Sequence, residues 1–464
     1  MSIEITATVR MFHVGELGDC FWLSFKDGKE ESNVLIDCGS FRNGHVSRQR
    51  LNQIVTYIMS RLNGKPLDVV IGTHQHNDHL SGFVHCERLF GGMVAQVWLS
   101  WLDNPKDEQA RTIKREQKNL IHNIKALQQK MKSPSMQIAK GLLTDILGFY
   151  NASGSDPEVP TKGIEILRGL GAKEPRYLDQ GEVLSLPGLP HNSVKVYTLG
   201  PPRNSKLLFD KDPQKDETYD PHLAFANTSA LRYLAALDNY DSSKRDRVED
   251  QFPFNEYYKK KRSKANPAML ARYDNSREGW RKIDDDWLEA VSRLGLYLDS
   301  YTNNSSLVLA FELVKSGKVL LFAADAQTGN WQSWDTIEWT EMAKGFSVKS
   351  LLRNTVLYKV GHHGSHNATL VKALEAMEHP ELVAMIPVDK SDSNILKKNG
   401  WKMPAKNLYK RLKEKTHYRV LLMDDGFADE CHPVKNNDKS RWNELPYLPI
   451  IDTENLFVEY KIKG

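Results

Sequence analysis

The sequence predicts an α/β protein in which short buried strands alternate with helices. The run 67–72 is short, β-branched and apolar, as expected of a strand that is buried on both faces. Between residues 113 and 131, by contrast, apolar side chains recur at a spacing of about 3.6 residues, with Lys and Glu on the opposite face. That pattern indicates an amphipathic helix. The chain therefore shows the sequence patterns of both buried strands and amphipathic helices, as expected of a mixed α/β fold.

The N-terminal part begins with three strands that we expect to form an antiparallel meander. A helix, the strand 67–72, a short helix and a further strand are expected to follow. In chain order, the predicted bounds are 5–12, 20–25 and 34–37 for the meander, 47–62 for the helix, 82–90 for the short helix and 94–99 for the last strand. Strand-like runs resume at 183–186 and 194–199.

Two segments, residues 103–172 and residues 203–297, interrupt this alternation. The first is predicted to be a helical insertion, and it either packs on the core or forms a lid over substrate. The second contains a basic stretch next to aromatic residues, made of Lys259, Lys260, Lys261, Arg262 and Lys264. Basic side chains interleaved with aromatic ones can hold phosphates and stack bases, although a solvated charge run is the commoner explanation.

Four potential metal ligands lie directly after the strand 67–72. His74, His76, Asp78 and His79 spell H-x-H-x-D-H. Loops at strand ends are where α/β proteins place their chemistry. Imidazole and carboxylate together suit Zn, Mn or Fe, and four ligands so close in sequence cannot all reach one ion with good geometry. The motif therefore predicts two divalent ions, with a solvated polar loop as the alternative.

With three further segments, this motif resembles the signature of the metallo-β-lactamase superfamily. Those segments are L-I-D-C-G at 35–39, the strand 318–326 that contains Asp325, and K-V-G-H-H-G-S at 359–365. The last of them is more specific, because it resembles the hydrolase domain of ComEC-type competence proteins. The resemblance implies a four-layer αββα metallo-β-lactamase sandwich with two largely helical insertions.

The matched segments run from residue 12 to residue 426, so we expect one metallo-β-lactamase-like domain over 1–464. The resemblance also implies the metal ligands, which are His74, His76, Asp78, His79, Asp325 and His363. The first two are assigned to one ion, and Asp78, His79 and His363 to the other. Asp325 is assigned to both ions as a bridge.

Other polar residues are assigned to supporting roles. Asp37, at the tip of an apolar strand, is expected to hydrogen-bond a ligand histidine. Asp19 either does the same or bridges the metal, with a structural role as the alternative. Asp78 is counted as catalytic as well as ligating. His362 is expected to donate to an oxyanion or to support the ligands, and Lys359 to neutralise a phosphoryl oxygen. A surface lysine is the alternative for Lys359.

One segment departs from the superfamily pattern. Many members carry a further histidine in G-H-T-x-G-S, whereas residues 301–306 read Y-T-N-N-S-S. The ComEC type also carries asparagine there, so the change marks a subfamily. It leaves the first ion with a water or an amide oxygen as a further ligand. An oxygen-richer set of ligands shifts the preference from Zn toward Mn or Mg.

Bulk properties exclude several other classes of protein. A formal charge of +4 over 464 residues is only mildly basic. The four scattered cysteines, Cys20, Cys38, Cys86 and Cys431, argue against a disulfide framework and for a reducing compartment. No signal peptide is evident, and no run of about 18 apolar residues predicts a membrane span. We therefore expect a cytoplasmic protein, and DNA uptake across a membrane is not implied.

The predicted function is that of a binuclear metal-dependent hydrolase. A phosphodiesterase or nuclease that acts through a hydroxide bridging the two ions fits best, with nucleic acid or a nucleotide as substrate. The same metal pair supports hydrolysis of a lactone, thioester or β-lactam. A third alternative is a metal-stabilised, non-catalytic component of a larger assembly. The fold alone does not choose among these functions.

Overall fold

The computed structural model describes residues 4–42, 44–130, 137–150, 159–208, 262–275, 298, 301–340, 346–397, 400–424 and 440–464. The chain forms two compact units. The first consists of Met1–Lys114, Gly148–Ala224 and Ser300–Gly464, and the second of Arg115–Leu147 and Phe225–Asp299. The single domain over 1–464 and the insertion bounds 103–172 and 203–297 stay predictions. Both sheets and the candidate site belong to the first unit.

The first sheet begins with the expected antiparallel meander of β1 (Thr6–Phe12), β2 (Cys20–Asp27) and β3 (Glu30–Cys38). Beside β3, the sheet continues in parallel through β4 (Val69–Gly72), β5 (Val97–Ser100) and β6 (Arg176–Leu178). On its other side β1 pairs with β15 (Phe457–Lys463), which pairs with β14 (Ile450–Ile451). The pattern of the sequence did not predict these C-terminal strands.

The second sheet combines an antiparallel part with a parallel part. The antiparallel strands are β7 (Val183–Ser185), β8 (Val194–Gly200), β9 (Val308–Leu313) and β10 (Lys318–Phe322). From β10 the sheet continues in parallel through β11 (Thr355–Lys359), β12 (Val383–Ile386) and β13 (Val420–Leu422).

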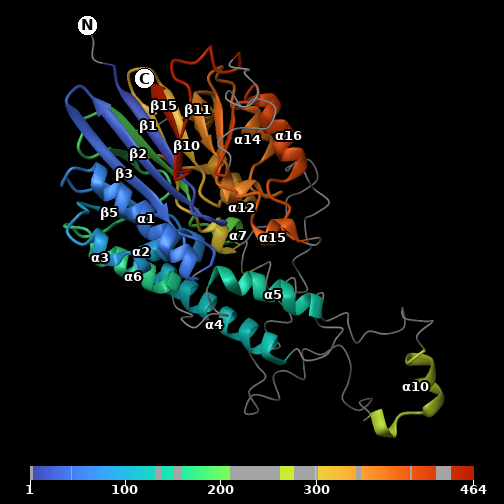
Figure 1. Cartoon of the computed structure of the whole chain (residues 1–464). Helices are drawn as coiled ribbons and strands as arrows, with labels where there is room; N and C mark the ends of the chain where they lie inside the picture. The colour runs from blue at the N-terminus through green and yellow to red at the C-terminus, as the bar shows by residue number, and fades with distance from the viewer. Residues whose placement is uncertain are drawn as a thin grey trace. The chain divides into compact units, whose positions relative to one another are not determined.

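Helices cover the outer faces of both sheets, which produces the predicted αββα layering (Figure 1). On the side of the first sheet lie α1 (His45–Arg61), α2 (Asn77–His85), α3 (Glu87–Phe90) and α6 (Val159–Leu170). On the side of the second sheet lie α14 (Val371–Glu375) and α16 (Lys406–Lys415). The other described α-helices are α4 (Glu108–Lys130), α5 (Gln137–Phe149), α7 (Ser205–Leu208), α10 (Pro267–Tyr273), α12 (Thr328–Gln332), α13 (Val348–Arg353) and α15 (Ser393–Leu396).

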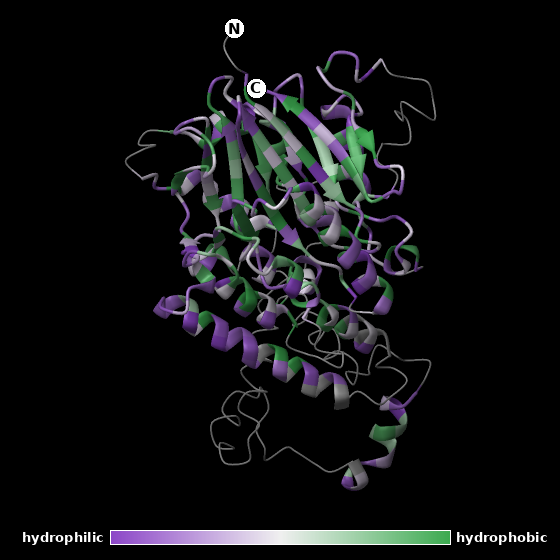
Figure 2. Cartoon of the chain, turned by 60° about the vertical axis from the view of Figure 1, so that its left-hand side comes forward, coloured by the Kyte–Doolittle hydropathy of each residue, from purple (hydrophilic) through white to green (hydrophobic). Residues whose placement is uncertain are grey.

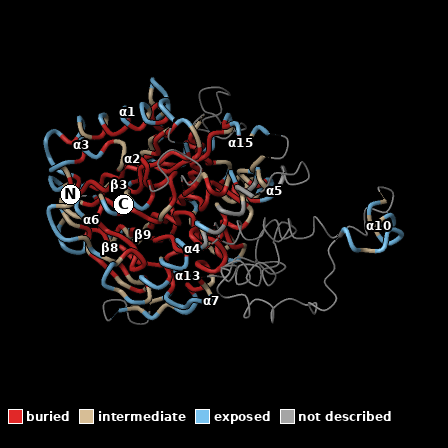
Figure 3. The backbone as a smooth tube through the Cα atoms, turned by 90° about the horizontal axis from the view of Figure 1, so that it is seen from below, coloured by how far each residue is buried: buried red, intermediate tan, exposed pale blue. Residues whose placement is uncertain are grey.

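The two sheets pack face to face through large apolar side chains. Phe25 of β2 stacks on Phe311 of β9, and Phe21 of β2 meets Phe322 of β10 edge-on, each pair with ring centroids 5.6 Å apart. Such pairs contribute about 0.5–1.5 kcal/mol beyond the burial of their surface. Hydrophobic residues are frequent along the strands of both sheets (Figure 2), and the strands are largely buried (Figure 3). The mixed α/β fold predicted from the sequence is confirmed.

Among the described helices, none has both the length and the apolar character needed to cross a lipid bilayer. Cys20, Cys38 and Cys86 are buried free thiols. Cys20 and Cys38 face each other at the paired ends of β2 and β3. Both side chains belong to the hydrophobic cluster between the sheets, so they serve core packing.

Candidate metal centre

The candidate site lies where strand ends of both sheets meet. In the first sheet β3 and β4 run parallel, so Asp37 at the end of β3 and His74 just after β4 share one edge. In the second sheet β10 and β11 run parallel, and Asp325 and His363 follow them in the same way. Because the carboxyl ends of parallel strands meet at one edge, distant segments deliver polar side chains to one place.

The H-x-H-x-D-H segment joins a loop to a helix. His74 and His76 lie in the loop, and α2 begins directly afterwards, earlier in the chain than predicted. Asp78 and His79 therefore lie in the first helical turn, where the helix dipole favours a carboxylate. Close packing of this turn requires a glycine after β3, since a Cβ on Gly39 would lie 2.3 Å from the backbone carbonyl carbon of Asp78.

Two histidines form one side of the site. His74 Nε2 lies 3.0 Å from His76 Nδ1, and both residues are buried. Burial and then the neighbouring His79 and His76 rings hold the pKa of His74 well below its usual value. Burial also lowers the pKa of His76, to about 3. Both imidazoles are therefore neutral near pH 7, which is the form that binds metal ions.

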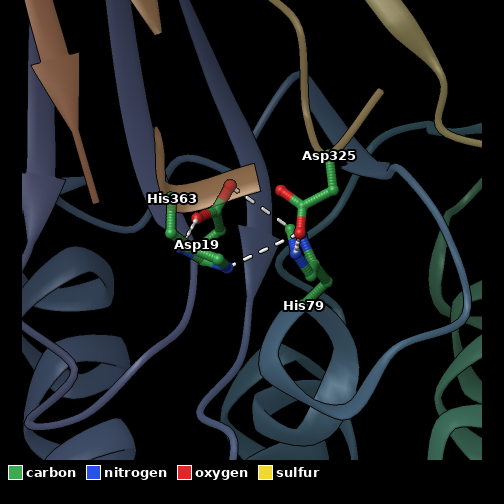
Figure 4. Close-up of side chains that lie close together, drawn as sticks. All are labelled: Asp19, His79, Asp325 and His363. Carbon is green, nitrogen blue, oxygen red and sulfur yellow. Dashed lines mark ion pairs between the residues drawn. The ribbon is translucent and has the colours of Figure 1, made fainter. Parts of the chain in front are cut away.

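The other side combines imidazoles with carboxylates (Figure 4). His79 Nε2 lies 3.2 Å from Asp325 Oδ2, and His363 Nε2 lies 3.1 Å from Asp78 Oδ2. Each of Asp19, His79, Asp325 and His363 offers one ligand atom, and these atoms lie within 4.8 Å of one another. These four residues are buried, and because their ligand atoms lie so close together they form a candidate metal cluster. Asp19, for which the sequence left a structural role open, lies inside it.

Hydrogen bonds on the outer ring nitrogens orient two of these histidines. His79 Nδ1 lies 2.7 Å from Asp37 Oδ2, the contact expected between Asp37 and a histidine of the site. Asp37 also accepts hydrogen bonds from the backbone N–H and the hydroxyl of Thr73. His363 Nδ1 donates to the carbonyl of Pro387 over 2.7 Å. In both rings Nε2 is left for the centre of the site, the usual arrangement of histidines that bind metals.

Lys359 is buried in the site, and its ammonium group has three partners. Nζ lies 2.5 Å from Asp19 Oδ2 and 3.3 Å from Asp325 Oδ1. It also donates to the carbonyl of Ala324 over 2.7 Å. An ammonium has three N–H donors, and these contacts use them all. The position of Lys359 thus favours holding the two carboxylates over contacting a phosphoryl oxygen, and the surface alternative does not apply.

The site is rich in buried carboxylates. The buried carboxylates around Lys359 are those of Asp19, Asp37, Asp78 and Asp325. Burial opposes ionisation of Asp325, but His79, His363 and Lys359 outweigh it and hold its pKa well below the usual range. Burial likewise opposes the charged form of His79, yet the carboxylates raise its pKa well above the usual value. Buried charge of one sign is costly unless cations compensate it.

The donor atoms of the site fit a metal ion. Several buried atoms have no hydrogen-bond partner among the described residues, and they are His76 Nε2, His79 Nε2, Asp19 Oδ1, Asp78 Oδ1 and Asp325 Oδ2. Buried polar atoms are nearly always paired in native proteins. Imidazole nitrogens and carboxylate oxygens are the donors that divalent transition ions take. Bound cations would therefore satisfy atoms that the protein leaves without partners.

The backbone is strained at the same strand ends. Asp37, Ala324, His362 and His363 have φ angles of 55°, 46°, 41° and 52°, in the left-handed region. This conformation costs residues with a Cβ about 1–2 kcal/mol each. Such strain persists where the surrounding structure enforces it, and it concentrates at active sites. Here the strained residues lie at the strand ends that supply polar groups to the site.

His362 lies in a buried network of amide and hydroxyl groups. Its Nδ1 is 3.1 Å from Gln327 Nε2 and 3.0 Å from Ser365 Oγ, and its Nε2 is 3.4 Å from Asn303 Nδ2. Asn367 donates to Gln327 Oε1 over 2.8 Å. Burial lowers the pKa of His362 to about 4, so its ring is neutral near pH 7. Sequence reasoning missed Gln327 and Asn367, although both lie close to recognised motifs in the chain.

The basic stretch of the second predicted insertion is described only in part. Lys259, Lys260 and Lys261 lie outside the described residues. Arg262 and Lys264 form the ends of a 3₁₀ turn, η6 (Arg262–Lys264), and Lys264 is exposed. A role of this stretch in nucleic-acid binding therefore stays a prediction.

Comparison with known families agrees with this geometry. Residues 17–95 match the family model of the Metallo-beta-lactamase superfamily, a range that contains Asp19, Asp37 and the whole H-x-H-x-D-H motif. The match supports a domain of this superfamily over the matched residues. A comparison with curated proteins gave no match. The superfamily domain and the candidate cluster together indicate a metal-dependent hydrolase.

Proposed function

We propose that this protein is a binuclear metal-dependent phosphodiesterase or nuclease of the ComEC type. The proposed ligands are His74 and His76 for one ion, Asp78, His79 and His363 for the other, and Asp325 for both. Buried ligand atoms without hydrogen-bond partners occur on the His76 side and on the Asp325 side, and together with the several carboxylates they support two cations. Mn, Zn and Mg are the candidate ions.

The observation that carries the proposal is the oxygen-rich character of the site. The carboxylates of Asp19, Asp78 and Asp325 lie among the histidines, and the segment 301–306 carries asparagines in place of the histidine that many superfamily members have there. Oxygen ligands favour Mn and Mg, and these ions serve phosphoryl transfer in many enzymes. The K-V-G-H-H-G-S segment at 359–365 adds the resemblance to a DNA-handling subfamily.

The chain's own residues have distinct tasks in this proposal. Divalent ions bound here would activate a water molecule and neutralise charge on the phosphoryl group. Asp37 keeps the ring of His79 oriented, and Lys359 holds the carboxylates of Asp19 and Asp325. His362, held by Gln327 and Ser365 in the structure, is the proposed partner of a substrate oxygen as charge develops on it.

A nucleic acid or nucleotide is the proposed substrate. The basic stretch over residues 259–264 would contribute by contacting the phosphate backbone, which strengthens binding without selecting a sequence. This contribution is separate from the chemistry, because capture of the backbone acts on affinity rather than on the reacting bond.

The test is hydrolysis by the purified full-length protein with Mn, Mg or Zn. Substrates are single-stranded DNA, RNA, cyclic nucleotides, an acyl lactone, a thioester and the β-lactam nitrocefin. We expect cleavage of a phosphodiester, fastest with Mn or Mg, and none after chelation of the metal. The proposal would be rejected if no phosphodiester were cleaved with any of the three metals while the lactone, thioester or nitrocefin was clearly hydrolysed. The protein would then be a lactone, thioester or β-lactam hydrolase.

A further inference from the structure

A group of aromatic side chains borders the His76 side of the metal centre. Phe149 and Tyr150, at the end of α5, lie with ring centroids 5.2 and 4.9 Å from the ring of His76. Phe41, after β3, and Trp401, before α16, pack on Phe149 with centroids 4.7 and 5.4 Å away. One segment of the first unit thus places two rings beside the proposed ligand His76, and two distant segments pack rings on Phe149. We call Phe41, Phe149, Tyr150 and Trp401 the aromatic wall.

The aromatic wall is separate from the hydrophobic cluster that fills the space between the sheets. None of its four residues belongs to that cluster as it is defined over the described chain. Polar contacts instead tie the wall to the site. The hydroxyl groups of Tyr150 and Thr302 lie 2.6 Å apart, and Thr302 precedes Asn303, which lies beside His362. The wall therefore belongs to the surroundings of the metal centre.

Trp401 is the member of the wall that reaches solvent. It is partly exposed, whereas Phe41 and Phe149 are 8% and 5% exposed. Its indole stacks on Phe149 with an interplanar angle of 26° and meets Phe41 edge-on at 86°. Its backbone N–H donates to the carbonyl of Asn394 over 2.8 Å. The indole is thus held against Phe149 and Phe41 in a residue that is partly exposed, and Phe149 lies between it and His76.

Basic residues adjoin the wall in the sequence. Arg42 follows Phe41 and its side chain is 43% exposed, and Lys402 follows Trp401 and is also exposed. The Arg42 guanidinium donates to the hydroxyl of Ser393 over 2.6 Å and lies 3.9 and 4.0 Å from carboxylate oxygens of Asp392 and Glu16. An aromatic ring with cations nearby has the composition of sites that bind single-stranded nucleic acid through its bases and its backbone.

Resting on the proposed function, we propose that the aromatic wall is a stacking subsite for a nucleobase. The base would belong to a single-stranded nucleic acid whose scissile phosphodiester lies at the metal centre, and Trp401 is the ring on which it stacks. Every base has a π-face, so this contact selects single strands over paired ones without selecting a sequence. Phe149 and Phe41 act behind Trp401 by holding its plane.

The test compares full-length wild type, Trp401→Ala and Trp401→Phe on two oligonucleotides of equal length. One is ordinary single-stranded DNA, and the other carries abasic tetrahydrofuran sites over the cleaved stretch. Loss of one stacked base corresponds to roughly 5- to 100-fold in affinity. We expect Trp401→Ala to raise KM for the ordinary strand by roughly 10-fold, with kcat little changed, and to leave KM for the abasic strand unaltered. Trp401→Phe should retain most of the wild-type KM.

Trp339→Ala is the matched control, because Trp339 is also partly exposed but packs on Tyr197 and Phe346 in another aromatic group. It should leave both substrates unaffected. The stacking subsite would be overturned by any one of three results in Trp401→Ala. These are an equal rise in KM on both oligonucleotides, a change confined to kcat, and no change in KM or kcat. If the wild-type protein neither binds nor cleaves the ordinary strand, the proposed function itself fails. Cleavage by the wild type with an unaffected Trp401→Ala removes only this inference.

Discussion

Replacing Asp325 with alanine is expected to strip the site of most of its metal and to abolish hydrolysis while the fold persists. Asp325 is the proposed ligand of both ions, and its Oδ2, 3.2 Å from His79 Nε2, is a buried atom without a hydrogen-bond partner among the described residues. Changes to outer partners of a metal site typically cost 10- to 100-fold in metal affinity, so loss of a shared ligand should cost more. The fold should survive, because the change removes one of several crowded buried carboxylates.

The measurement is metal content by elemental analysis after dialysis, with activity and circular dichroism on the same samples. Asp68→Ala is the matched control. Asp68 precedes the opposite end of β4, where it accepts a hydrogen bond from the backbone N–H of Asn33. That variant should keep its metal. Unchanged metal occupancy in Asp325→Ala would show that the ligands have been assigned wrongly.

Replacing Lys359 with methionine is expected to destabilise the metal-free protein by about 3–5 kcal/mol, the cost of breaking a buried ion pair by removing one partner. Nζ is 2.5 Å from Asp19 and 3.3 Å from Asp325, so both carboxylates would lose their cation at once. Adding Asp19→Asn to this variant should recover part of the loss, because the substitution removes one uncompensated charge. Thermal and urea unfolding of the metal-free chain measures both effects.

The same variant separates two roles of Lys359. If its ammonium group contacted a phosphoryl oxygen, as expected from sequence, the variant would lose about 10²- to 10³-fold in kcat with little change in stability. Lys318→Met is the control, since Lys318 pairs with Glu381 at 2.7 Å but both side chains are partly exposed. Exposed pairs contribute about 0–1 kcal/mol. A stability loss no larger than that of Lys318→Met, with a large fall in kcat, would restore the catalytic role.

Much of the fold followed from local patterns in the sequence. The apolar runs that became β1 to β5, β7 and β8 are periodic or continuous, and neighbouring strands in the chain also pair in space. Two features did not follow from the sequence. β15 pairs with β1 across almost the whole chain length, and β14 pairs with β15; no local pattern encodes these contacts. The early start of α2 depends on close packing at Gly39.

The candidate site, like the fold, could be predicted from the sequence only in part. Histidines and aspartates at strand ends were visible as motifs, because each follows an apolar run directly. The pairing of Asp19 with Lys359 was not visible, since hundreds of positions separate them and only the meeting of the two sheets brings them together. For the same reason the contacts of Phe149 with Phe41 and Trp401 could not be inferred, although each residue alone reads as ordinary apolar packing.

The most direct test of the two-ion site is anomalous X-ray scattering from crystals of the full-length protein grown with Mn or Zn, recorded above and below the absorption edge of the metal. We expect two peaks in the first unit. One peak should lie against His74 and His76 and the other against His79 and His363, with Asp325 between them. A single peak, a peak bound by His362 instead of His363, or no peak among these residues would contradict the account.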